Sequence, residues 1–255
     1  MAERSGERRE RRAHRAATIT ITALALAVLT ALAIALSGPA HRFGLLGARW
    51  TIGIFAVAGL VSLAAAALAL VGIGLALPSR AWRSVAGSAL ALCIGLAAGW
   101  APLAMARTAA KVPLIHDVTT DTDRPPQWVM LKPQRAAAEN GTAYGGPAVA
   151  ALQKRGYPDL APLLLPVPPD RAFARVQATA RSMGWRIVAA VPADGRLEAI
   201  DITRWFGFAD DIVVRVTAAP SGSRVDVRSA SRVGRSDLGV NARRIRAFLT
   251  LVRGS

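Results

Sequence analysis

Three long apolar runs fill most of the first half of the chain. They cover residues 16–36, 51–77 and 84–106, and no Asp, Glu, Lys or Arg lies inside any of them. Each run reaches the roughly 20 residues that a helix needs to cross the hydrocarbon core of a bilayer. Because lipid offers no partners to backbone N–H and C=O groups, these runs must be helical. The pattern therefore predicts a three-helix transmembrane region within residues 16–111.

A different pattern begins after Lys111, where short segments of alternating apolar and polar residues replace the long runs. Alternation with period two is typical of half-buried strands, and recurrence every three to four residues is typical of helices. Strands are predicted at residues 185–191, 197–203, 212–217 and 224–228, and helices at 170–183 and 237–252. We expect an α+β domain over residues 112–255, with a four-stranded antiparallel meander sheet and both helices packed on one face.

The last two predicted strands contain their own register signal. Val214 and Val227 must lie on the same face, which allows direct pairing or a register two residues away. Direct pairing places Arg215 opposite Asp226, and opposite charges at such positions attract each other. We therefore predict that Val214 lies opposite Val227.

The segments around this sheet have weaker patterns. Residues 112–133 contain four prolines and are expected to be extended, residues 147–155 to form a short helix, and residues 157–169 to form an irregular apolar strap. Ser236 or Asp237 is suited to cap the closing helix. The apolar stripe of that helix is expected to contain Leu238, Ile245, Phe248, Leu249 and Val252.

Several segments of the second half carry a family resemblance: IHDVTTDTDRPP, YPDLAPLLL, GWRIVAA, FADDIVVRV, VDVRSASRVGRSDLG and NARRIRAFL. Taken in this order they resemble the family catalogued as domain of unknown function 1499, over about Val112 to Val252. The resemblance brings no established reaction, ligand or catalytic residue. Members with several membrane spans before the domain look like envelope proteins, so it implies an envelope location.

Positive charge is present in both halves of the chain. The formal charge is +16; residues 1–111 hold 12 Lys and Arg against 3 Glu, and residues 112–255 hold 20 against 13 acids. Residues 1–15 form a basic arm that includes Glu3 and Arg4, and we interpret it as a cytoplasmic anchor rather than a nucleic-acid-binding tail. Arg80 and Arg83, in the connection between the second and third runs, lie on the same side of the membrane as this arm. Because cytoplasmic segments are enriched in Lys and Arg, this bias favours a cytoplasmic N-terminus. With three spans, we expect a protein of the bacterial inner membrane whose C-terminal domain lies in the periplasm.

Three acids are the candidates for catalysis. Asp210 and Asp211 stand at the start of the third strand, and Asp201 lies in the second. Paired carboxylates can divide acid and base roles. Neighbours on a strand point to opposite faces, however, and pairing with Arg228 or Arg232 explains the acids without catalysis. We therefore favour ion pairing with arginines over catalysis as the role of these acids.

Anion binding is the second candidate chemistry. Arginine forks suit phosphate and carboxylate, and solvated arginines with scattered ion pairs are the alternative. The candidates are Arg228, Arg232, Arg235, Arg243 and Arg244. The aromatic residues Trp205, Phe206 and Phe208 can line a pocket or enter the bilayer surface, but a hydrophobic plug is favoured. Asp117, Asp121 and Asp123 have no known metal-ligand spacing and are interpreted as a solvated linker rather than a calcium site.

The residues indicate a membrane-anchored envelope protein rather than a hydrolase with a serine or cysteine nucleophile. The domain contains a single histidine, His116, no G-x-S-x-G motif and no metal-ligand pair. Cys93 is the only cysteine, so no disulfide can form within the chain. We expect no cofactor and no metal. The predicted function is a non-enzymatic module that binds an anionic envelope component, such as lipid head groups or a polymer, or a protein partner. The alternative is a carboxylate-dependent enzyme acting on a cell-wall or lipid substrate.

Overall fold

The computed structural model of the protein describes the backbone of residues 2–254 and the side chains of residues 6–254. Glu3 and Arg4 of the basic arm therefore lie outside the described side chains. The chain forms two compact units, Met1–Arg107 and Thr108–Ser255. Each unit is considered by itself below.

The first unit consists of three helices, α1 (Ala2–Arg42), α2 (Ala48–Ser79) and α3 (Trp82–Ala109). Each is long and apolar enough to cross a membrane, which confirms the three predicted spans. The described part of the basic arm is not a separate segment but the beginning of α1.

Small residues bring the helices of the first unit close together. Gly95 of α3 faces the backbone of α2, and a Cβ at this position would lie 2.8 Å from the carbonyl oxygen of Ser62. The Ser62 hydroxyl donates to the Gly95 carbonyl at 3.1 Å. Close approach of this kind stabilises membrane helices through van der Waals contact and hydrogen bonds.

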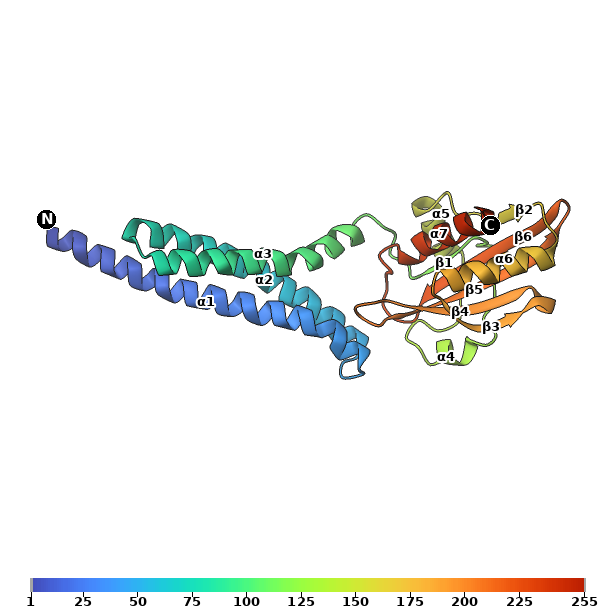
Figure 1. The fold of residues 1–255 in the computed structure, drawn as a ribbon, viewed down its shortest axis with the longest axis horizontal. Coiled ribbons are helices and arrows are strands. Elements are labelled where there is room, and N and C mark those ends of the chain that lie inside the picture. Colours follow the sequence, from blue (N-terminus) through green and yellow to red (C-terminus); the bar gives the residue numbers. More distant parts are fainter. Residues whose placement is uncertain (1, 255) are drawn as a thin grey trace. The chain divides into compact units, whose positions relative to one another are not determined.

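The second unit contains a six-stranded antiparallel sheet in the order β1-β6-β5-β4-β3, with β2 also paired to β6 (Figure 1). The strands are β1 (Asp117–Thr119), β2 (Leu163–Leu165), β3 (Arg186–Val191), β4 (Arg196–Ile202), β5 (Ala209–Ala219) and β6 (Gly222–Ser231). The predicted meander is correct for β3 to β6, but the prediction of four strands is wrong. β1 and β2 have three residues each, too few for alternation to reveal them.

The register of the central pair agrees with the prediction. Val214 lies opposite Val227, and Arg215 lies opposite Asp226. The β3–β4 hairpin also forms as predicted, through a short 3₁₀ turn, η1 (Pro192–Asp194), and Gly195 at φ 59°. A Cβ at Gly195 would lie 2.0 Å from the carbonyl oxygen of Val216, so glycine is required there.

Helices α6 (Pro169–Ser182) and α7 (Val240–Gly254) pack along one face of the sheet, as predicted (Figure 1). The valines of β5 and β6 form the core with them, and Trp185 stacks on Phe248 at 4.9 Å between ring centroids. The expected stripe of α7 is correct except for Leu238, which precedes the helix and has φ 53°. The carboxylate of Asp237 caps α7 by accepting from the Asn241 amide at 2.7 Å.

The opposite face of the sheet is covered as well, which the sequence did not predict. Residues 120–145, which we call the covering segment, run over it and include the short helix α4 (Lys132–Ala136). Trp128 and Leu131 of this segment are buried against Ile200, Val213 and Ala230. The predicted short helix is α5 (Gly146–Gly156). The second unit is therefore a three-layer structure in which both faces of the sheet are buried.

Candidate functional site

The sheet face beneath residues 120–145 is lined by charged side chains, and we call it the charged face. They alternate along β4, β5 and β6 with the apolar residues that pack on α6 and α7. The charged face consists of Arg196, Glu198, Asp211, Arg215, Arg224, Asp226 and Arg228, with Asp117 from β1. Glu198, Asp211, Asp226 and Arg228 are 0% exposed. Buried charges require partners, so the contacts of these side chains define the site.

Arg228 is completely enclosed by its partners. Its Nε and Nη2 atoms donate to the Asp117 carboxylate at 3.0 and 2.7 Å, a bidentate ion pair. Its Nη1 atom donates to the carbonyl of Pro126, and Nη2 also donates to the carbonyl of Thr142. The guanidinium lies 4.9 Å from the Trp128 ring centroid. Arg228 therefore binds the covering segment to the sheet.

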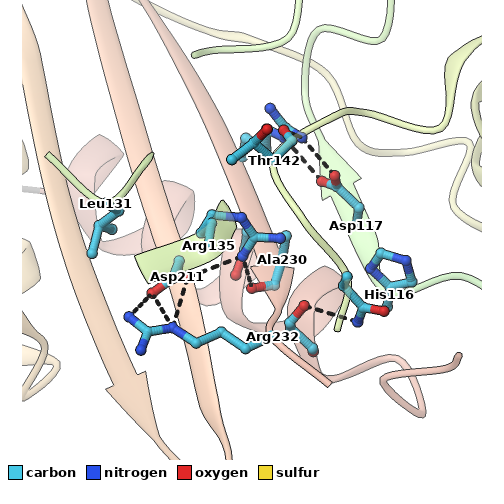
Figure 2. A network of polar contacts seen from close by, with 12 residues as sticks. His116, Asp117, Leu131, Arg135, Thr142, Asp211, Ala230 and Arg232 are labelled. Atoms are coloured by element: carbon cyan, nitrogen blue, oxygen red, sulfur yellow. Dashed lines mark hydrogen bonds and ion pairs between the residues drawn. The ribbon is translucent and has the colours of Figure 1, made fainter. Parts of the chain in front are cut away.

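Asp211 joins two arginines from different elements. Its carboxylate accepts from Arg135 of α4 at 3.0 Å and from Arg232 at 2.8 Å (Figure 2). Arg135 also donates to the carbonyl of Ala230, and its guanidinium lies 4.7 Å from the Trp128 ring centroid. The rings and guanidiniums stabilise one another through cation–π contact.

Glu198 holds the chain just before α4. Its carboxylate accepts hydrogen bonds from the amides of Val129, Met130 and Leu131 at 2.9 to 3.2 Å, and forms an ion pair with Arg196. Hydrogen bonds from backbone amides to a carboxylate are among the stronger hydrogen bonds in proteins. Glu198 thus fixes the covering segment at a second point.

A third cluster lies nearer the β5–β6 turn. Asp226 and Asp121 both accept from Arg215 and Arg224, at 2.9 to 3.0 Å. Burial alone would raise the pKa of Asp121, but the Arg124 amide and the guanidiniums of Arg224 and Arg215 together hold it below its ordinary value. The Asp121 carboxylate is therefore stabilised in its charged form by this cluster.

The interpretation of Asp117, Asp121 and Asp123 as a solvated linker is wrong for the first two. Asp117 and Asp121 are buried in ion pairs with arginines of the charged face, because the segment crosses the sheet instead of leading to it. Asp123 is exposed and faces Lys154 at 3.6 Å. Within residues 6–254, no group of three His, Cys, Asp or Glu is arranged to hold a metal ion.

The three candidate catalytic acids lie on two different faces. Asp211 is on the charged face, whereas Asp210 and Asp201 point to the side of α7, where both accept from Arg244 at 2.7 and 2.8 Å. The Arg244 guanidinium occupies the space between these two carboxylates. Of the expected partners, Arg232 does pair with Asp211, but Arg228 pairs with Asp117 instead.

The candidate anion-binding arginines do not form one surface. Arg228 and Arg244 are buried, and Arg232 is partly exposed and bound to Asp211, so the interpretation as solvated arginines is wrong for these. Arg235 and Arg243 are exposed, and Arg243 donates to the carbonyl of Leu238 at 3.0 Å. Only these last two present an open guanidinium among the five.

The aromatic loop between β4 and β5 is not the expected plug. Phe206 and Phe208 stack on each other at 5.1 Å, but Trp205 is 53% exposed. A core residue would be enclosed on all sides. The loop instead presents Trp205 to its surroundings.

The sequence analysis missed Glu198 of the charged face and three residues of the segment that covers it: Trp128, Arg135 and Tyr144. Burial raises the pKa of Tyr144 to about 12, with Asp117 adding to the shift. Burial lowers the pKa of His116, and the Asp117 carboxylate opposes that change. The signal that could have found these residues is the charge at every second position of β4 and β6, opposite a segment rich in aromatic and basic residues.

Comparison with protein families identifies the second unit. The model of the family described as protein of unknown function (DUF1499) matches residues 117–252, more than half of the chain. The chain belongs to this family. A comparison with curated proteins finds no match. The DUF1499 match begins with Asp117, the partner of Arg228, and ends within α7. It therefore contains the sheet together with the layers on both of its faces.

Proposed function

We propose that the protein is a non-enzymatic, membrane-anchored module of the bacterial cell envelope. Its three apolar helices hold it in the inner membrane, with the N-terminus in the cytoplasm and the DUF1499 domain in the periplasm. The domain binds an anionic envelope component, or an acidic protein partner, through exposed arginines. The arginine bias at the helix ends supports this orientation.

The distribution of charge in the domain carries the proposal. Seven of its thirteen carboxylates are bound to arginines on the charged face or at Arg244: Asp117, Asp121, Glu198, Asp201, Asp210, Asp211 and Asp226. Other basic side chains are exposed and form no ion pair with any carboxylate of residues 6–254: Arg124, Lys132, Arg155, Arg171, Arg181, Arg186, Arg235 and Arg243. Because the acids are neutralised internally, the surface carries an excess of positive charge. Such a surface attracts anions and repels cationic partners.

Arg235 and Arg243 are the binding residues that we propose from the original cluster. Both are exposed near the start of α7, and neither is needed to neutralise a buried carboxylate. Arg228 and Arg244 contribute indirectly, because they occupy the acids that would otherwise cancel the surface charge. Trp205 is exposed beside the same end of the sheet and can add apolar contact.

The test uses the full chain in phosphatidylcholine nanodiscs, mixed with phosphatidylglycerol vesicles and separated by flotation. Binding is expected in low salt and release in high salt, since exposed charges are screened. Replacing both Arg235 and Arg243 with alanine is expected to weaken binding about 30-fold, because each cation near an anionic surface contributes about 1 kcal/mol.

A matched control shows whether altering α7 without changing the net charge affects binding, while the basic arm of α1 is the same in every variant. The double variant Arg246→Ala/Asp159→Ala removes an ion pair of α7 without changing net charge, so its binding should equal that of the wild type. Binding that is unchanged in the Arg235/Arg243 variant would refute the proposed site. The orientation is tested separately by a reporter enzyme that is active only in the periplasm, fused after Ser255. Activity of a cytoplasm-only reporter at that position would contradict it.

A further inference from the structure

We infer that the β4–β5 loop inserts its apolar side chains into the boundary between head groups and acyl chains of the bilayer that holds α1, α2 and α3. This docking is driven by apolar contact and does not depend on the anionic partner proposed above. It concerns residues 202–208 and the neighbouring segment that leads into β1.

The loop exposes apolar surface that the domain does not use. Ile202, the last residue of β4, is 46% exposed, and Trp205 is 53% exposed. The neighbouring Arg204 is exposed too. Tryptophan combined with an aliphatic residue and a cation is the composition that favours a membrane interface, because the ring is amphipathic and the guanidinium reaches phosphate.

The loop is held in one conformation before it meets any partner. The Thr203 hydroxyl accepts from the Phe208 amide at 2.9 Å, and the amides of Thr203 and Gly207 close the turn through two further 2.9 Å bonds. Gly207 has φ 74°, a conformation that favours glycine. Because Phe206 and Phe208 also stack on each other, the loop loses little conformational entropy on binding.

The position of the loop within the domain points to the membrane as its partner. The Arg232 amide donates to the Ala209 carbonyl, the Ser231 amide to the His116 carbonyl, and the Asp237 amide to the Ile115 carbonyl. The β4–β5 loop therefore lies at the end of the sheet that receives the chain from α3 (Figure 1). We call it the linker end.

The linker is too short to carry this end far from the bilayer. Only residues 110–116 separate the last residue of α3 from the first residue of β1. A fully extended segment of this length spans about 25 Å, which is comparable to the hydrocarbon core thickness. The same segment exposes Leu114 at 58% together with Lys111, so apolar and basic side chains continue from the linker to the loop.

Another exposed leucine provides a matched control. Leu164 is 63% exposed on β2, where it pairs with Arg224 close to the β5–β6 turn. That turn lies at the end of the sheet away from the linker end. Membrane docking through the linker end leaves Leu164 in water.

The experiment uses the full chain with Cys93→Ala, so that one added cysteine carries a fluorescent nitrobenzoxadiazole label. Ile202→Cys, which keeps Trp205, and Leu164→Cys are each reconstituted in phosphatidylcholine bilayers that contain brominated lipid, in high salt. We expect several-fold stronger quenching at position 202 than at position 164. Zwitterionic lipid and high salt remove the electrostatic attraction, so failure of the anion-binding proposal would not affect this result.

A second measurement removes the influence of the label itself. Hydrogen exchange of residues 202–208 in the unlabelled full chain is expected to be slower in bilayers than in detergent, and Trp205→Ser should abolish the difference. Equal quenching at both positions, quenching that disappears in high salt, or exchange indifferent to Trp205→Ser would each overturn the inference.

Discussion

The two faces of the sheet are both buried, but by different chemistry. On one face, Val214, Val216 and Val227 pack against α6 and α7, and the buried ion pair of Asp210 with Arg244 lies at the start of β5. On the other, Arg228 and Asp211 lie at equal depth and are joined to a segment more than 60 residues away in sequence. Apolar residues can exchange with one another at moderate cost, whereas each buried charge depends on one particular partner. We call the face that contains Val214, Val216 and Val227 the valine face. The charged face therefore tolerates fewer substitutions in its covering segment than the valine face tolerates in α6 and α7.

Breaking the Arg228–Asp117 ion pair is expected to have the largest effect. Arg228→Ala leaves the Asp117 carboxylate buried without its partner, which costs about 3–5 kcal/mol. The free energy of unfolding of the domain can be measured on the full chain in detergent by pulse proteolysis across a urea series. A loss of this size would place the charged face among the main stabilising regions of the fold.

Two variants make the comparison specific. Arg228→Met combined with Asp117→Leu replaces the pair by apolar side chains and should recover most of the stability, because no charge is left unpaired. Arg171→Ala, at an exposed position of α6, should change the free energy of unfolding by less than about 0.5 kcal/mol. If Arg228→Ala lowers the free energy of unfolding by less than about 1 kcal/mol, the Arg228–Asp117 ion pair is exposed to solvent and the covering segment does not bury the charged face.

Releasing the covering segment at Glu198 tests the same face with a smaller change. Glu198→Gln keeps the shape of the side chain but removes the charge that three backbone amides share. Hydrogen bonds to charged groups contribute about 1.5–3 kcal/mol, so we expect a loss of about 2 kcal/mol. Hydrogen exchange should become faster at Val129 to Leu131 and remain unchanged in α7. Exchange that is unaltered at residues 129–131 would contradict the assigned contacts; Glu139→Gln, at an exposed position, serves as control.

The parts of the fold that the sequence predicted are those with a local signal. The three spans follow from uninterrupted apolar runs, and the β5–β6 register follows from valines at alternate positions. β1 and β2 are too short to alternate, and they are recognisable only once β6 is there to pair with them. The valine face was therefore predictable and the covering of the charged face was not.

The candidate site was only partly predictable for a related reason. Alternation along β5 correctly separated Asp210 from Asp211. It could not show that Arg228 pairs with a residue 111 positions earlier, because ion pairs between distant segments leave no periodic pattern. Alternating charge suggested a solvated face, yet the same pattern occurs when a second layer supplies the opposite charges. The sequence alone consequently could not show that only Arg235 and Arg243 of the five candidate arginines are exposed.

The smallest expected effect concerns His116, which lies where the two faces meet at the linker end. Its Nδ1 atom is buried without a hydrogen-bond partner, and its carbonyl accepts from Asn241 on the α7 side, while Asp117 belongs to the charged face. Burial holds the pKa of this histidine below its ordinary value of 6.5, with Arg135 adding to the shift.

The direction of the pH dependence follows from this lowered pKa. Below pH 6.5 the unfolded chain binds a proton at His116 that the folded domain resists, so stability falls as the pH decreases through this range. One proton limits the slope to about 1.4 kcal/mol per pH unit. Burial raises the pKa of Asp237, so this group makes the stability increase as the pH decreases, opposite to His116. The pKa of Asp121 is lowered, so its contribution to stability is lost only as the pH falls below its ordinary pKa of 3.8. Pulse proteolysis of the full chain between pH 5 and pH 8 should therefore show a smaller loss toward acid in His116→Leu than in the wild type, and identical slopes would show that His116 is solvated.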